Sequence, residues 1–210
     1  MKSHPPTRQS GFTLIELLVV ISIIAVLAGL AIPTANIVLR KAKETQARAA
    51  VQGLVIGVKG YQTEYNRLPN PGKSTTDATI DTDSGNDMIS VLLGKNAAYN
   101  PREIPFYDPP IAKGAANGLI SGAAGGGGGS SYVVVDPWVD SKTKMGSPYH
   151  MAFDYDGDRS ISNPVKTAAS GKFNAAFIAA EPTDLSADVV VYSDGDPHLS
   201  STTRKPITSW

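Results

Sequence analysis

The chain contains no cysteine and no excess of charge of either sign. Without cysteine, no disulfide can staple the fold and no thiol can act as a nucleophile. The 19 Lys and Arg residues balance the 19 Asp and Glu residues, so no basic face for nucleic acid is indicated and we expect no nucleic-acid partner. The 210 residues, 41% of them hydrophobic, suffice for one or two domains with a modest core.

Histidine is scarce as well, with only His4, His150 and His198. None of the three stands at the spacing of a serine-hydrolase triad or of a zinc protease. We therefore expect that the protein is not an enzyme.

One long apolar stretch lies near the N-terminus. Between Phe12 and Ile32 the only charged side chain is Glu16. As a helix, this run would span roughly 30 Å, the thickness of a hydrocarbon core, so we expect residues 12–33 to be able to cross a bilayer. Basic residues flank it on both sides, and a bare positive-inside count would leave the C-terminal side in the cytoplasm.

A short polar leader, residues 1–11, precedes the apolar stretch and ends in Gly11. A secretory signal has its small-residue cleavage site after the apolar stretch, whereas here the glycine comes before it. A cut at Gly11 would leave the apolar helix on the mature protein, with Phe12 as the new N-terminus.

The residues from Gly11 to Glu16, together with the apolar run, resemble the prepilin leader of type IV pilins and of type II secretion pseudopilins, and Pro33 falls where that family usually kinks its helix. The resemblance implies that a prepilin peptidase cuts after Gly11 and methylates the amine of Phe12. It implies that Glu16 guides assembly by pairing with the first amine of a neighbouring subunit. It also implies a cytoplasmic leader with the bulk of the chain on the opposite side, against the positive-inside count.

Glu16 has a second interpretation that needs no partner. Thr13 and Glu16 have the spacing of a capping box, in which the glutamate satisfies backbone donors at a helix start. The assembly role is favoured, because a carboxylate within a membrane segment costs about 2.5 to 3.5 kcal/mol and is rarely kept without a partner. The box also leaves the preceding glycine unexplained. The two roles can alternate, with capping before assembly and pairing afterwards.

After Pro33 the pattern becomes amphipathic and predicts that the helix continues through residues 34–68, ending near Arg67. Gly53, Gly57 and Gly60 recur in this segment, either as marks of close packing or as ordinary tolerated glycines. One apolar face is expected to pack on a sheet and consists of Val51, Leu54, Val55, Val58, Tyr61, Tyr65 and Leu68.

Residues 69–131 read as a variable insert. A short helix is expected over Met88–Leu93, and Gly114–Ser131, with five consecutive glycines at 125–129, is expected to be a flexible loop. A phosphate-binding loop is excluded there because its Lys and Ser or Thr are missing.

Residues 132–210 contain short β-prone runs separated by turn residues, which predict a small antiparallel sheet. With the long helix laid on this sheet, the expected fold class is α+β and pilin-like. The expected strands are Tyr132–Val135, Tyr149–Phe153, Phe173–Ala179, Val189–Tyr192 and Ile207–Trp210.

Three phrases in this region resemble the major pseudopilin of type II secretion systems rather than a disulfide-bearing pilin. They are Asp136-Pro137-Trp138 followed by Pro148-Tyr149, then Tyr192-Ser193-Asp194-Gly195, and finally Ile207-Thr208-Ser209-Trp210.

Two acidic clusters are candidate calcium sites. Asp154, Asp156 and Asp158 alternate as in calcium loops, because calcium takes six to eight oxygens from a short flexible segment. An EF-hand would need Gly at Arg159 and Glu at Val165, so a solvated Asp-Gly turn is an equal alternative.

The second cluster contains Asp194 and Asp196. The pseudopilin resemblance implies a calcium ion in this loop, bound by one of these aspartates and by an acid near the last strand. Pro206 stands where that second acid would lie and has no side-chain oxygen. The expectation is therefore a merged site in which Asp154 or Asp158 replaces it.

The resemblance implies a structural subunit that self-polymerises into a periplasmic pseudopilus driving type II secretion. Its expected partners are other copies of itself, prepilin peptidase, minor pseudopilins, the inner-membrane secretion platform and, before assembly, membrane lipid. The expected location is the inner membrane, with one span and a periplasmic C-terminal domain. The alternatives are a type IV pilin for adhesion, motility or DNA uptake, and a single-span, membrane-anchored calcium-binding domain that never polymerises. A secreted hydrolase with an uncleaved signal is disfavoured.

Overall fold

The computed structural model describes residues 12–83, 87–122, 132–167 and 171–210, and within them it leaves out the side chains of residues 30–35. Helix α1, Leu14–Tyr65, is the longest element and ends two residues before the predicted Arg67. The chain divides into two units, residues 1–42 and 43–210, and α1 contributes to both.

Among the residues that the structure describes, no helix is both long enough and apolar enough to span a membrane. The stretch predicted to do so, residues 12–33, includes residues 30–33, whose side chains lie outside the described ones.

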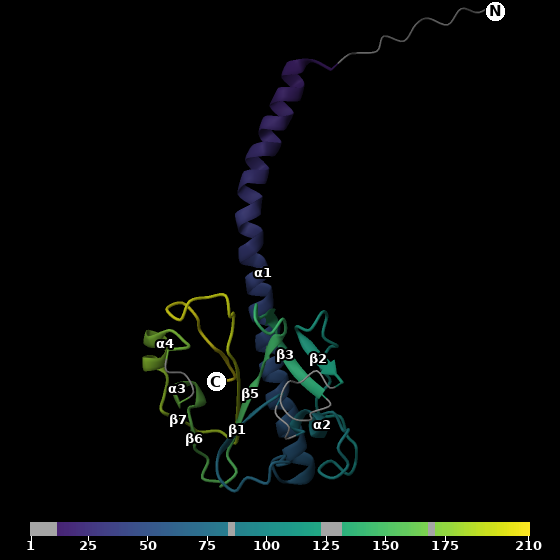
Figure 1. The fold of residues 1–210 in the computed structure, drawn as a ribbon, viewed down its shortest axis with the longest axis vertical. Helices are drawn as coiled ribbons and strands as arrows, with labels where there is room; N and C mark the ends of the chain where they lie inside the picture. The colour runs from purple at the N-terminus through teal and green to yellow at the C-terminus, as the bar shows by residue number, and fades with distance from the viewer. Residues whose placement is uncertain (1–11, 84–86, 123–131, 168–170) are drawn as a thin grey trace, which may run out of the picture. The chain divides into compact units, whose positions relative to one another are not determined.

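In its described residues, the second unit combines three small sheets with short helices (Figure 1). All paired strands among them are antiparallel. The sheets have the strand orders β1-β5-β8-β9, β2-β3-β4 and β6-β7. This arrangement confirms the expected α+β class. The elements are β1 Ala78–Asp81, α2 Met88–Leu92, β2 Gly118–Ser121, β3 Tyr132–Val139, β4 Gly146–Pro148, β5 His150–Phe153, β6 Ile161–Ser162, α3 Pro164–Thr167, α4 Ala175–Ala180, β7 Asp184–Leu185, β8 Val189–Ser193 and β9 Ile207–Thr208.

The main core lies between the second half of α1 and the four-stranded sheet. The predicted amphipathic face is confirmed, because Val51, Leu54, Val58 and Tyr61 are fully buried. They belong to one apolar cluster with residues of β3, β5 and β8. Figure 1 shows β3 and β5 beside α1.

The other face of the same sheet is covered by the segment from β6 to β7. Because side chains alternate along a strand, Met151 and Val191 face α1, whereas Ala152 and Val190 face the opposite side. There they meet Ile161 of β6 and Leu185 of β7. The sheet is therefore apolar on both faces.

The segment Phe106-Tyr107 packs closely against the recurring glycines of α1. A Cβ at Gly57 would lie 3.0 Å from the carbonyl oxygen of Phe106, and one at Gly53 would lie 2.9 Å from the ring of Tyr107. At Gly60 the corresponding distance to the ring of Phe106 is 3.3 Å. Of the two interpretations, close packing is the one that the structure supports.

Three sequence-based expectations are corrected. Phe173–Ala179 is not a strand, because Asn174 caps a helix there by accepting a hydrogen bond from the Phe177 N–H at 2.9 Å. The expected loop Gly114–Ser131 contains strand β2, which pairs with β3. The expected variable insert, residues 69–131, contains strand β1, which pairs with β5 of the main sheet. The helix at residue 175 is set by a local cap, whereas β1 and β2 form because strands distant in sequence pair with them. In all three places the local preference for a secondary structure is weak. The five consecutive glycines, 125–129, lie outside the described residues.

Candidate functional site

The N-terminus of α1 has the geometry of a capping box. The backbone N–H and the hydroxyl of Thr13 both donate to Oε2 of Glu16 at 2.8 Å, and the Glu16 N–H is 3.3 Å from the Thr13 hydroxyl oxygen. Two otherwise free groups at the helix start are thus satisfied. In the single chain, the Glu16 carboxylate is held by its own helix.

Every large apolar side chain from Phe12 to Leu27 is exposed, the least exposed being Val20 at 46%. Apolar residues cover all sides of this part of α1, so no single polar face remains to face water. Contiguous apolar surface of this kind marks an interaction with lipid or protein.

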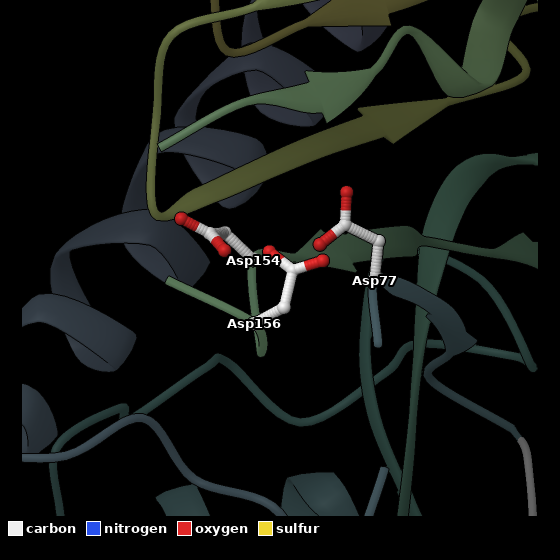
Figure 2. Close-up of side chains that lie close together, drawn as sticks. All are labelled: Asp77, Asp154 and Asp156. Atoms are coloured by element: carbon white, nitrogen blue, oxygen red, sulfur yellow. The ribbon is translucent and has the colours of Figure 1, made fainter. Parts of the chain in front are cut away.

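A group of three aspartates lies beside the edge of the main sheet (Figure 2). Asp77 precedes β1, Asp154 and Asp156 follow β5, and one carboxylate oxygen of each lies within 4.8 Å of the others. Asp154 is buried and accepts hydrogen bonds from the backbone N–H groups of Gly157, at 2.6 Å, and Arg159, at 2.8 Å. Burial and then the charges of Asp156 and Asp154 raise the pKa of Asp77.

The residues from Asp154 onward form an Asp-Gly turn, and Asp77 adds a third carboxylate to it. Asp158 stands outside the group and accepts a hydrogen bond from the Ser160 N–H at 2.7 Å. Three clustered carboxylates are the oxygen ligands that calcium prefers, but they supply only part of its six to eight. Calcium binding here stays a prediction.

Asp194 does not join this group, and the expected merged site is not formed among the described residues. Its buried carboxylate lies 2.5 Å from Nζ of Lys172 and 3.4 Å from Nε2 of His150. Burial raises the pKa of Asp194, but the hydrogen bonds and charges of His150 and Lys172 outweigh it and hold the pKa below its usual value. Asp196 accepts a hydrogen bond from the His198 N–H at 3.0 Å.

His150 joins two acids. Its Nδ1 lies 2.5 Å from Oδ1 of Asp81, on the side opposite to Asp194, and its ring stacks on Tyr192. Burial lowers the pKa of His150, but hydrogen bonds and charges from Asp194 and Asp81 outweigh it and raise the pKa to about 9.

Asp136 is fully buried and joins three chain segments. Its carboxylate accepts hydrogen bonds from the Ser193 hydroxyl at 3.0 Å, the Ser147 N–H at 2.9 Å and the Trp138 N–H at 3.3 Å. Burial raises the pKa of Asp136 to about 7. The phrases singled out at 136–138 and 192–195 therefore meet at one carboxylate, beside Pro148-Tyr149.

Comparison with known proteins bears on the N-terminus. Residues 6–32 match the family model described as the prokaryotic N-terminal methylation motif. The N-terminus of the chain carries this methylation motif. The capped Thr13–Glu16 start and the apolar residues that follow it lie within the matched segment.

The curated proteins similar to this chain include a type IV major pilin protein and two fimbrial proteins. It is 30% identical over 90 residues to the type IV major pilin protein PilE1 of Neisseria gonorrhoeae, covering 43% of this chain and 54% of that protein. It is 33% identical over 85 residues to a fimbrial protein of Neisseria meningitidis serogroup B, covering 40% and 50%. A fimbrial protein of Moraxella nonliquefaciens is 32% identical over 88 residues, covering 42% and 56%. The chain thus spans about half the length of the curated relatives it matches. No solved structure matches it at the same level of significance.

Some site residues were predicted from the sequence and others were not. Gly11 lies outside the described residues, whereas Phe12 is described and exposed. Asp77 was missed, because its place beside Asp154 depends on the pairing of β1 with β5, where Ala78 is opposite Phe153. Lys172, the partner of Asp194, carried no signal in the sequence.

Proposed function

We propose that this chain is a structural, non-catalytic subunit that is cut after Gly11, methylated at Phe12 and polymerised through α1 into a periplasmic pseudopilus for type II protein secretion. Before assembly its apolar helix is stored in inner-membrane lipid as a single span, with the C-terminal domain in the periplasm. Its partners are other copies of itself, prepilin peptidase, minor pseudopilins and the inner-membrane secretion platform.

The observation that carries polymerisation is the exposed apolar start of α1 with one acid in it. Moving this surface from lipid into a bundle of identical helices exchanges one apolar environment for another, so extraction exposes little of it to water. The Thr13–Glu16 capping box gives the carboxylate a partner in the single chain. On assembly, the methylated amine of a neighbour's Phe12 takes over that role.

The choice of a pseudopilin rests on the C-terminal phrases and on the lack of cysteine. Asp136, in the first phrase, is hydrogen-bonded to Ser193, in the second. The second phrase also pairs with the third, with Tyr192 opposite Thr208 and Ser193 opposite Ile207. The three phrases thus form one connected unit that needs no disulfide.

The first experiment measures the mass of the mature chain extracted from membranes. Processing after Gly11 with methylation predicts a protein that begins at N-methylated Phe12. An unprocessed chain, or a cut after residue 33 that removes the apolar stretch, would contradict the proposal.

The second experiment compares filament formation by the wild type, Glu16→Ala and the control Glu44→Ala, which removes a half-buried acid elsewhere on α1. We expect filaments from the wild type and the control, and none from Glu16→Ala. Wild-type amounts of filament from Glu16→Ala would refute the assembly role. No filament from any chain would favour the membrane-anchored calcium-binding domain.

A second candidate function is that of a type IV pilin, which the three curated relatives favour. Deletion of the chain separates the two. A pseudopilin predicts that exported proteins accumulate in the periplasm, whereas a pilin predicts loss of surface filaments with normal export.

A further inference from the structure

The loop between β8 and β9, residues 194–206, contains the guanidinium group of Arg204, which binds backbone oxygens of the same loop. Arg204 donates from Nε to the carbonyl oxygen of Asp194 at 2.9 Å and from Nη2 to that of Gly195 at 3.3 Å. Lys172 lies 2.5 Å from the Asp194 carboxylate. Two carbonyl oxygens and a buried carboxylate are therefore satisfied by a guanidinium and an ammonium group.

The two cations are held in place by the segment 172–174. Lys172 Nζ and Arg204 Cζ lie 5.8 and 6.0 Å from the centroid of the buried Phe173 ring, within range of a cation–π contact. The Asn174 N–H donates to the carbonyl oxygen of Arg204 at 2.8 Å, and its side-chain amide donates to that of Thr202. The loop is thus bound to the segment 172–174 through both the guanidinium group and the backbone carbonyl of Arg204.

These contacts use the oxygens that a metal ion would need. Calcium takes carboxylate and carbonyl oxygens, and the pseudopilin resemblance implies a calcium ion in this loop. Here the Asp194 carboxylate is paired with Lys172 and His150, and its carbonyl oxygen accepts from Arg204. Pro206 is buried and offers no side-chain oxygen. Asp196, the other candidate ligand, accepts a hydrogen bond from the His198 N–H at 3.0 Å, and its one carboxylate supplies too few of the six to eight oxygens that calcium takes. The residues of this loop therefore do not fit the implied ion.

We propose that Arg204 and Lys172 replace calcium as the cations that order this loop, so that it folds independently of calcium. The inference does not depend on whether the filament is a pseudopilus or a pilus, because it rests on contacts within the C-terminal unit.

The test is hydrogen exchange measured by mass spectrometry on the full chain in detergent, with calcium in excess or with a chelator. Peptides covering residues 194–208 report on the loop. Three chains are compared: the wild type, Arg204→Gln and the control Lys205→Gln. The control removes a neighbouring charge that contacts the ring of Phe177 rather than the loop carbonyls.

We expect equal exchange of the wild-type loop in calcium and in chelator. Arg204→Gln should exchange about tenfold or more faster in this loop, as expected when hydrogen bonds to a charged group are lost, and Lys205→Gln should not. Slower exchange of the wild-type loop on adding calcium would overturn the proposal, and so would an unchanged loop in Arg204→Gln. The wild-type comparison decides the matter even where Arg204→Gln fails to fold.

Discussion

The carboxyl group of Asp136 is buried in the interior of the fold and accepts three hydrogen bonds. Burial raises its pKa to about 7 from the ordinary 3.8. A carboxyl group whose folded pKa is raised contributes stability that is fully present below about pH 4 and is lost as the pH rises through about 7. Asp136 therefore makes the protein less stable when it ionises.

Asp136→Asn should remove this part of the pH dependence, because an amide of the same shape cannot ionise. Between pH 4 and 8, the free energy of unfolding of the wild type should fall relative to that of the variant, by about 2 to 4 kcal/mol. Urea unfolding of both chains across this range is the measurement. Parallel pH profiles would show that Asp136 is not the titrating group.

Calcium at the acidic turn is a prediction that single residues can test. If Asp77, Asp154 and Asp156 bind the ion, calcium should raise the melting temperature of the wild type, since a ligand that binds only the folded state stabilises it. Asp156→Asn should abolish the rise. Asp158→Asn, which removes an equal charge just outside the group, should keep most of it. Melting temperatures that ignore calcium in all three chains would contradict the prediction.

At the scale of elements, the packing of Phe106-Tyr107 on α1 depends on the glycines of that helix. The backbone of residue 106 comes so close at Gly57 that a methyl group would meet its carbonyl oxygen, which cannot rotate away. At Gly60 the nearest atom belongs to a side chain at 3.3 Å, which can move by a few tenths of an ångström.

Gly57→Ala should therefore destabilise the protein by about 1 to 3 kcal/mol through overpacking, although alanine is the better helix former by about 1 kcal/mol. Gly60→Ala should be close to neutral, because the gain in helix propensity offsets the smaller clash. Chemical denaturation of the two variants compares them directly. Equal stabilities of the two variants would show that Phe106-Tyr107 does not pack tightly against Gly57.

At the scale of the whole molecule, Trp210 links separate parts of the second unit, residues 43–210. Trp210 packs against both smaller apolar clusters, one around Ala152 and Leu185 and the other around Val165 and Phe173. Its Nε1–H donates to Glu181, at the end of α4, at 2.7 Å. Ser209, next to it, is hydrogen-bonded to Val191 of β8 and accepts from Gln52 of α1 at 3.3 Å.

Trp210→Ala should lower the free energy of unfolding by about 2 to 4 kcal/mol, because a large apolar contact between two clusters is lost. Trp210→Phe keeps a smaller aromatic ring but loses part of the indole and the hydrogen bond to Glu181, so an intermediate loss of about 1 to 2 kcal/mol is expected. Thermal unfolding of the full chain gives both values. A larger loss in Trp210→Phe than in Trp210→Ala would be inconsistent with this division.

The sequence by itself determined the features that depend on near neighbours. The step of three and four residues predicted the buried face of α1, Thr13 and Glu16 predicted the capping box, and the spacing of Asp154 and Asp156 predicted their approach. Each of these follows from the fixed repeat of a helix or the short reach of a turn, which a few consecutive residues define.

Only the tertiary structure decided the contacts between distant segments. Asp77 reaches Asp154 through the register of β1 against β5, Asp136 receives the Ser193 hydroxyl, and Arg204 fills the loop in which the family resemblance implies calcium. These pairings depend on which strands become neighbours and in what register, and a shift by one residue turns a side chain to the other face. That choice is made by the packing of the whole core, so no local stretch of sequence contains it.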